Sequence, residues 1–343
     1  MNKVKIGKKL FTVLLSGMLL SLTYSNLAFA SNTPTKYGYE IKQLLNQGFT
    51  NGDEKTLIQL LDIGFSVTDI ESIQKSEFDR FTLSNEKVVS KKEQYARIAY
   101  NVNSKVKTIE YFDENNYINQ FNKDINEHKT VQASSNNSVQ TSQGVISPLS
   151  VVSEIHQDGD VSWLHLSTTI SYSSTTDQYS LYNFFTWKTN PVLCQSDILG
   201  IGVSTNFSYI PNSEYFSYHA DHYHYDTTSG SYNRTEYVNK GTHESTGSGG
   251  EGFTVPLFQN VNTGGGGYQV VDTYTNHAGY MYYRANLNKS VGTTYANAYG
   301  SYSHQSVGIT GSPSYSYPSG GSISISLEWT YSKVNATSQV TVN

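Results

Sequence analysis

The chain has 343 residues, of which 23 are Lys or Arg, 28 are Asp or Glu, 28 are Tyr and one is Cys. A nucleic-acid-binding protein carries a basic surface, so the formal charge of −5 argues against that class. A single Cys excludes a disulfide framework and a zinc site built from cysteines. No apolar run after the N-terminus is long enough to cross a membrane as a helix.

Residues 1–30 have the pattern of a secretory signal peptide. Four lysines precede an apolar segment at 10–22, and Ala28-Phe29-Ala30 has the small-x-small pattern that a signal peptidase cleaves. The lysine-rich start resembles the signal peptides of Gram-positive bacteria. We therefore predict a secreted, extracellular protein whose mature chain starts at Ser31. Without the four lysines it keeps 19 basic and 28 acidic residues, so its formal charge is −9.

Residues 31–130 are predicted to form a small helical domain. Apolar residues recur at helical spacing before Gly48 and again before Gly64, and each glycine is expected to end a helix. The segment that starts at Ser66 has the pattern of a capping box and begins a third helix. The spacing of apolar residues predicts a further helix over 91–101. Both a protein-docking module and a cap or pro-segment fit this pattern.

The composition and the spacing of apolar residues change in the second half of the chain. Residues 131–147 are polar and rich in Ser, Asn and Gln, which predicts a linker. In residues 148–343, alternation by two predicts an antiparallel β-sandwich or jelly-roll-like domain, so the predicted fold is mostly β. The expected strands cover 162–171, 181–188, 198–209, 214–225, 234–240, 252–258, 269–275, 280–287, 295–304 and 322–330.

Tyrosine is concentrated in the predicted β domain, which holds 21 of the 28 tyrosines. A Tyr side chain offers a flat apolar face with a hydroxyl at its edge, and this suits contact with sugars or proteins. Tyr is also a good strand former, so a purely structural role is the alternative. The tyrosines that we predict to bind a ligand are Tyr215, Tyr218, Tyr223, Tyr225, Tyr237 and Tyr282.

The sharpest cluster of titratable residues lies at 218–226. On a strand, His222, His224 and Asp226 share one face, and imidazoles two residues apart can converge on one zinc or copper ion. The string resembles the start of the metallo-β-lactamase signature, but Thr227 stands where that family has a further histidine. We name His222, His224 and Asp226 as candidate ligands of a divalent metal, and we predict no other cofactor. The alternative is an exposed polar strand near a hairpin.

No catalytic motif stands out. The chain has no nucleophile elbow, no zinc-protease motif and no recognisable Cys–His arrangement, so we predict no catalytic residue and favour a role other than an enzyme. Two carboxylates that cleave a glycosidic bond need not be close in the sequence. The first candidates for such a pair are Glu214, Asp221, Glu236 and Asp272.

Three functions fit these patterns. The first is a secreted, non-catalytic binding protein whose β domain recognises a polysaccharide or a cell-surface partner through exposed tyrosines. The second is a secreted β-pore-forming toxin, in which the alternating segment at 164–176 would become a membrane hairpin. The third is a secreted hydrolase with a metal or carboxylate site. Nucleic acid is a partner under none of them, and a membrane is a partner only under the second.

Overall fold

The computed structural model describes residues 36–46, 49–82, 85–101, 106–136, 161–191, 196–226, 231–239, 242–247, 249–257, 261–263, 270–290, 294–305, 315–316, 324–325 and 331–342. The predicted signal peptide lies outside these residues. Contacts divide the chain into two compact units, Met1–Gly38 and Tyr39–Asn343. All the elements below, apart from the first residue of α1, belong to the second unit.

Helices are concentrated before the main sheets. They are α1 (Gly38–Asn46), the 3-10 turn η1 (Asn51–Asp53), α2 (Glu54–Ile63), α3 (Val67–Glu71), the 3-10 turn η2 (Lys75–Glu77), α4 (Phe78–Thr82) and the longer α5 (Glu114–Asn136). The strands are β1 (Glu86–Asn101), β2 (Val106–Phe112), β3 (Val161–Ser173), β4 (Gln178–Trp187), β5 (Ser196–Val203), β6 (Phe207–Tyr209), β7 (Tyr215–Asp226), β8 (Ser231–Asn239), β9 (Thr242–Gly247), β10 (Gly250–Pro256), β11 (Val261–Thr263), β12 (Val270–Leu287), β13 (Tyr295–Gln305), β14 (Tyr315–Ser316), β15 (Ser324–Ile325) and β16 (Tyr331–Thr341).

Two antiparallel sheets form the centre of the fold. The first sheet has the order β2-β1-β3-β4-β12-β7-β8, and β6 and β11 also pair with β12. The second sheet has the order β16-β13-β5-β10-β9. Alternate apolar side chains of both sheets meet in one buried core, which includes Leu164, Leu166, Phe185, Leu199, Ile201 and Tyr302. The predicted mostly β fold, with antiparallel sheets preceded by short helices, is confirmed.

The sequence signals for the ends of the short helices are also confirmed. The backbone N–H of Gly64 bonds the carbonyls of Leu60 and Leu61 in a left-handed conformation, with φ of 111°, and so ends α2. Ser66 and Asp69 form the expected capping box at the start of α3, because each side chain accepts a hydrogen bond from the backbone N–H of the other. Gly48 lies outside the described residues.

The helix predicted over 91–101 is wrong, because these residues belong to strand β1. This strand pairs with β3 on one side and, near its end, with β2 on the other. Around 95–98 both of its faces are covered, so Tyr95, Ala96 and Ile98 are all buried although they point to different sides. Because apolar residues lie on both faces of the strand, their spacing in the sequence resembles that of a helix. The first residues of the predicted linker at 131–147 belong to α5, which continues to Asn136, and residues 137–147 lie outside the described ones.

Several strand boundaries differ from the prediction. The single strand expected over 198–209 is two strands, β5 and β6, whereas the two strands expected between 269 and 287 are one long strand, β12. Only Ser324–Ile325 of the strand predicted at 322–330 is described as a strand. The strand near the C-terminus, β16, was not predicted.

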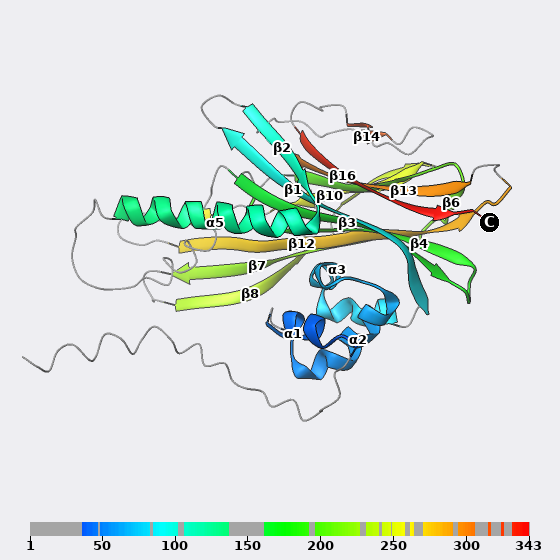
Figure 1. The fold of residues 1–343 in the computed structure, drawn as a ribbon, viewed down its shortest axis with the longest axis horizontal. Coiled ribbons are helices and arrows are strands. Elements are labelled where there is room, and N and C mark those ends of the chain that lie inside the picture. The colour runs from blue at the N-terminus through cyan, green and yellow to red at the C-terminus, as the bar shows by residue number, and fades with distance from the viewer. Residues whose placement is uncertain are drawn as a thin grey trace, which may run out of the picture. The chain divides into compact units, whose positions relative to one another are not determined.

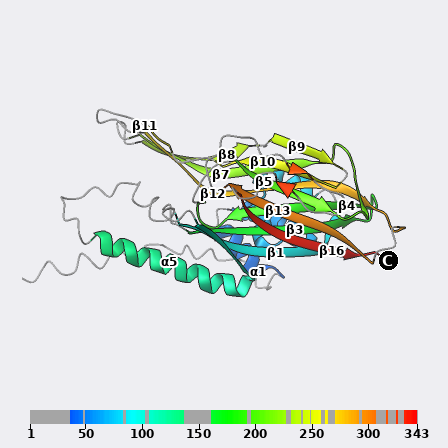
Figure 2. The same cartoon turned by 90° about the horizontal axis from the view of Figure 1, so that it is seen from above.

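The helices cover the face of the first sheet that points away from the second sheet. Figure 2 shows α1 and α5 at one side, with β9 and β10 of the second sheet at the opposite side. Phe65 packs edge-on against Tyr182 and Phe184 of β4. In α5, the buried Asp124 accepts hydrogen bonds from Trp163 Nε1 at 2.9 Å and Arg97 Nε at 2.8 Å. We call α1–α4 with their 3-10 turns the helical layer (Figure 1).

Candidate metal centre

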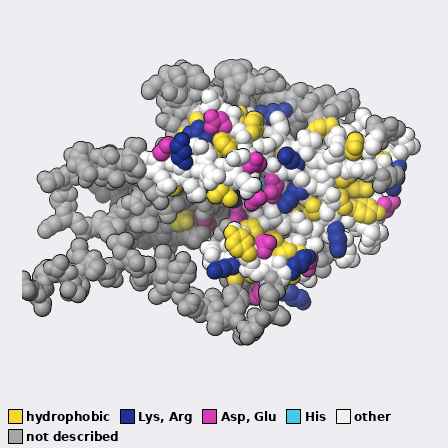
Figure 3. Space-filling model, in the orientation of Figure 1, with side chains coloured by type: hydrophobic (Ala, Val, Ile, Leu, Met, Phe, Trp, Pro, Cys, Tyr) yellow, Lys and Arg dark blue, Asp and Glu magenta, His cyan; other side chains and the backbone are white. Residues whose placement is uncertain are grey.

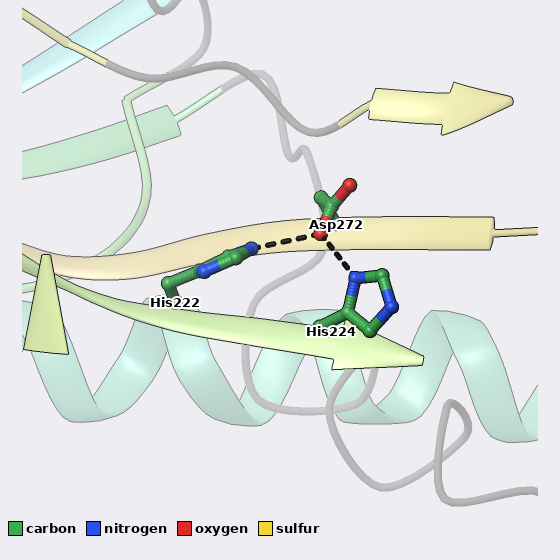
Figure 4. Close-up of side chains that lie close together, drawn as sticks. All are labelled: His222, His224 and Asp272. Carbon is green, nitrogen blue, oxygen red and sulfur yellow. Dashed lines mark hydrogen bonds and ion pairs between the residues drawn. The ribbon is translucent and has the colours of Figure 1, made fainter. Parts of the chain in front are cut away.

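Two histidines and one aspartate come together where β7 pairs with β12. In the antiparallel register, His224 lies opposite Asp272 and His222 lies opposite Tyr274. Cross-strand partners and residues two positions apart project to the same face of a sheet, so these side chains are neighbours. Figure 4 shows the two imidazoles approaching the carboxylate from both sides.

The geometry of the three groups is tight. One carboxylate oxygen of Asp272, Oδ1, lies 2.8 Å from His222 Nε2 and 2.8 Å from His224 Nδ1. The three potential ligand atoms all lie within 4.8 Å of one another. The side chains are 22%, 39% and 25% exposed for His222, His224 and Asp272, so the group is accessible from solvent.

The histidines control the ionisation of the aspartate. Partial burial favours a higher pKa for Asp272, but the hydrogen bonds and charges of His224 and His222 outweigh it and lower that pKa below its ordinary value of 3.8. A lowered pKa in the folded state stabilises the fold at pH values above the ordinary pKa, and this contribution is lost as the pH falls through the folded value. The carboxylate is therefore ionised at neutral pH and ready to bind a cation.

Neighbouring residues fix the orientation of the group. The ring of Tyr274 stacks on His222, with centroids 4.6 Å apart and planes 9° apart. The register of β12 against β7 shifts between Thr275 and Ala278, where Asn276 adopts a positive φ of 54°. Such a bulge changes which side chains of a strand face each side of the sheet. It thereby places Asp272 on the same face as the histidines.

The structure places the predicted metal ligands partly as expected. His222 and His224 share one face, as predicted, but the carboxylate between them belongs to Asp272 and not to Asp226. In the register Asp226 lies opposite Val270, at the last residue of β7. Sequence reasoning named Asp272 only as one of four carboxylates for glycoside cleavage. It lies 48 residues from His224, and only the pairing of β7 with β12 reveals the contact.

The six predicted tyrosines do not form one exposed strip. Tyr218 is fully buried, and its hydroxyl oxygen lies 2.6 Å from Nδ1 of His277. Tyr215 and Tyr282 lie opposite each other on β7 and β12 under the helical layer, where Arg80 lies 3.8 Å from the Tyr215 ring. Contacts with the layer bury most of Tyr282, which is 9% exposed.

The other three predicted tyrosines lie towards the far end of β7 and on β8. Tyr223 and Tyr225 are partly exposed. Tyr237 lies opposite Ala220 in the pairing of β8 with β7, and its side chain is outside the described ones. Of the six, Tyr223 and Tyr225 are therefore the described side chains with accessible surface outside the contact with the helical layer.

Two of the other predicted carboxylates, Glu214 and Asp221, accept hydrogen bonds from different residues, and the side chain of Glu236 is outside the described ones. Glu214 accepts a hydrogen bond from the hydroxyl of Tyr209, and Asp221 accepts one from Asn276 Nδ2 at 2.7 Å. Glu236 lies opposite Asp221 in the pairing of β7 with β8.

Most of the segment predicted as a membrane hairpin, 164–176, is buried in the fold, and residues 174–176 at its end are exposed. Strand β3 lies between β1 and β4, and eleven of its thirteen residues are buried. Both faces of its central part are covered, by the second sheet on one side and by helices on the other. Release of 164–176 into a membrane would therefore require the core of the first sheet to open.

The surface agrees with the charge balance of the sequence. On the face drawn in Figure 3, Lys and Arg side chains are scattered among acidic and uncharged ones and form no large basic area. Among the described helices, none combines the length and the hydropathy required to cross a membrane.

Comparisons with known proteins identify no family for the chain and give only distant likenesses to solved structures. No family model matches the chain, and no curated protein matches it. One similar solved structure is the NetB toxin of Clostridium perfringens in its membrane-inserted form, at 8% identity and a TM-score of 0.22 over 52% of this chain and 91% of that one. Another is described as a pore forming protein, at 9% identity and a TM-score of 0.24 over 52% of this chain and 87% of that one.

A third similar structure is the KRT10-binding region domain of the pneumococcal serine-rich repeat protein PsrP. It is 13% identical, with a TM-score of 0.19, over 48% of this chain and 87% of that one. At these TM-scores the three similarities give no argument for a shared function.

Proposed function

We propose that the protein binds a divalent transition-metal cation of the zinc class at His222, His224 and Asp272, as an extracellular binding protein without catalytic activity. The observation that carries this proposal is the position of one carboxylate oxygen 2.8 Å from a ring nitrogen of each histidine. Imidazole nitrogen and carboxylate oxygen are the zinc ligands of many proteins, at about 2.0–2.2 Å from the ion. Small side-chain rotations bring the three atoms around one ion.

The donor set favours transition metals over magnesium or calcium. Two imidazoles suit zinc, copper and nickel, whereas magnesium and calcium prefer oxygen ligands alone. An ion held by His222 and His224 of β7 and Asp272 of β12 would join the two strands at this end of the sheet. Three protein ligands leave a coordination position for water or for a donor group of a bound partner.

Recognition of a polysaccharide or of a cell-surface partner stays a prediction. The side chains that support it are Tyr223 and Tyr225, which lie on the face of β7 opposite to that of the metal ligands and are partly exposed. Secretion is supported by the signal-peptide pattern of residues 1–30.

Zinc is expected to raise the thermal stability of the purified protein. A ligand that binds only the folded state at 100 times its Kd adds about 2.7 kcal/mol, which corresponds to several degrees in Tm for a chain of this size. Differential scanning calorimetry after EDTA treatment, with Zn²⁺ or Mg²⁺ added back, measures the effect. We expect a rise with Zn²⁺ and none with Mg²⁺. An equal response to both ions, or to neither, would contradict the proposal.

A further inference from the structure

His165, a histidine outside the metal centre, is buried, and no hydrogen bond to it is found among the described residues. His165 lies on β3 and has no exposed surface, and neither of its ring nitrogens has a hydrogen-bond partner in the described part of the chain. Its nearest carboxylate is Glu93 of β1, with Nε2 and Oε1 3.9 Å apart. Its cross-strand partners in the first sheet are Tyr95 and Thr186. A neutral imidazole tolerates such a site, whereas a protonated one would be a buried charge.

His165 is connected to the helical layer through β1 and β4. Glu93 lies 3.2 Å from the ammonium of Lys91, and this ammonium lies 3.6 Å from the buried carboxylate of Asp69 in α3. Next to His165 on β4, the hydroxyl of Thr186 lies 2.7 Å from that of Ser72, which follows α3. The contacts that hold α3 on the sheet therefore surround the imidazole.

His165 is also connected to α5. Its ring lies 4.6 Å from the ring of Tyr95, and Tyr95 stacks on Tyr117 of α5 at 4.2 Å. The titratable and charged groups that face the imidazole or its direct neighbours come from four elements. They are Asp69 and Glu71 of α3, Lys91, Glu93 and Tyr95 of β1, Lys188 after β4, and Glu114 and Tyr117 of α5.

We propose that His165 is an acid-sensitive latch whose protonation releases the helical layer from the first sheet. A proton on the ring would attract Glu93 away from Lys91 and would repel Lys91 and Lys188. The contact between Lys91 and Asp69 would lose its geometry, and α3 would lose one of its anchors. Once the layer opens, water reaches the imidazolium and stabilises its charge.

The direction of the pH effect follows from the burial of His165. Burial, followed by the charges of Lys188 and Lys91, holds the pKa of His165 well below its ordinary value of 6.5. The closed layer therefore takes up this proton less readily than the open layer, and acid favours opening below about pH 6.5. With an ordinary pKa in the open layer, His165 favours opening up to about 30-fold more at pH 5 than at pH 8.

Asp69 acts in the opposite direction. Burial, only partly offset by Lys91, raises the pKa of its carboxyl above the ordinary value of 3.8. The closed layer therefore takes up a proton at Asp69 more readily than the open layer does, and this opposes opening. Comparing the chain that contains His165 with variants that lack it separates the two effects, because Asp69 is present in all of these proteins.

Thiol labelling measures the opening in the full-length chain. In a Cys194→Ser background, a Ser72→Cys variant places a thiol in the buried contact between α3 and β4. An Ala298→Cys variant places one in the core between the two sheets, where Ala298 is fully buried, and reports global unfolding. EDTA is present throughout, and each labelling rate is divided by that of the urea-unfolded variant at the same pH.

The normalised labelling rate of the Ser72→Cys variant is expected to rise up to about 30-fold from pH 8 to pH 5, while the Ala298→Cys variant stays protected. Adding His165→Phe, which keeps a ring beside Tyr95, or His165→Gln should remove most of the rise. Both substitutions of His165 are made, because the test needs only one of the two proteins to fold. An unchanged rate, the same rise without His165, or a parallel rise in the Ala298→Cys variant would overturn the proposal.

Discussion

Replacing His222 and His224 together by Ala is expected to lower the affinity for Zn²⁺ by more than about 100-fold. Changes to outer-sphere partners of a metal already cost about 10- to 100-fold, and these substitutions would remove two of the three proposed ligands themselves. Both side chains are accessible from solvent, so the substitutions leave no cavity in the core. Competition between the protein and a chromogenic chelator at neutral pH measures the affinity.

The matched control for this variant is His219→Ala. His219 is on the same strand, but its odd position in the alternation puts it on the opposite face of β7 from His222 and His224. Its substitution should leave the Zn²⁺ affinity within about threefold of that of the native chain, a change below 1 kcal/mol. If the double variant kept the native affinity, or if His219→Ala lost as much, the histidine pair would not be the site.

The second large effect is expected at the contact between the two sheets. A side-chain carbon added at Gly300 of β13 would lie 1.8 Å from Thr168 Oγ1 and 2.6 Å from Asn183 Oδ1. Thr168 Oγ1 donates a hydrogen bond to the carbonyl of Ala336 at 3.0 Å, and Asn183 Nδ2 donates one to the carbonyl of Gly200 at 3.0 Å. Both bonds join the first sheet to the second.

Gly300→Ala is therefore expected to lower the free energy of unfolding by about 3 kcal/mol or more, because it overpacks the core and breaks buried hydrogen bonds together. Urea unfolding monitored by tryptophan fluorescence checks this value. The control is Gly52→Ala, where the nearest atom is 3.6 Å from the added carbon, and a change within about 0.5 kcal/mol is expected. Equal stabilities of the two variants would show that the sheets do not approach each other as described.

The sequence predicted the fold class because its main signals are local. The alternating segment at 162–171 forms β3. Gly64 ends α2 and the capping box at Ser66 begins α3, as expected. The prediction failed at β1, because around 95–98 this strand is buried on both faces and carries no alternation to distinguish it from a helix. It also divided β12 in two, since a bulge changes the phase of the alternation.

The candidate site was predictable in part for the same physical reason. Two histidines two residues apart on one strand share a face, which the sequence states directly. Their carboxylate partner comes from β12, and strand order cannot be read from a single sequence. The tyrosines failed in another way, because Tyr218 and Tyr282 are as suitable for a buried aromatic contact as for an exposed one. Composition gives their number but not their exposure.

The central claim is that Asp272, and not Asp226, completes the site with the two histidines. Isothermal titration of Zn²⁺ into the native chain, Asp272→Ala and Asp226→Ala tests it most directly, because the two carboxylates differ in position and not in chemistry. We expect one Zn²⁺ per chain for the native protein and for Asp226→Ala, and an affinity at least about 10-fold lower for Asp272→Ala. Loss of binding in Asp226→Ala with native binding in Asp272→Ala would contradict the account.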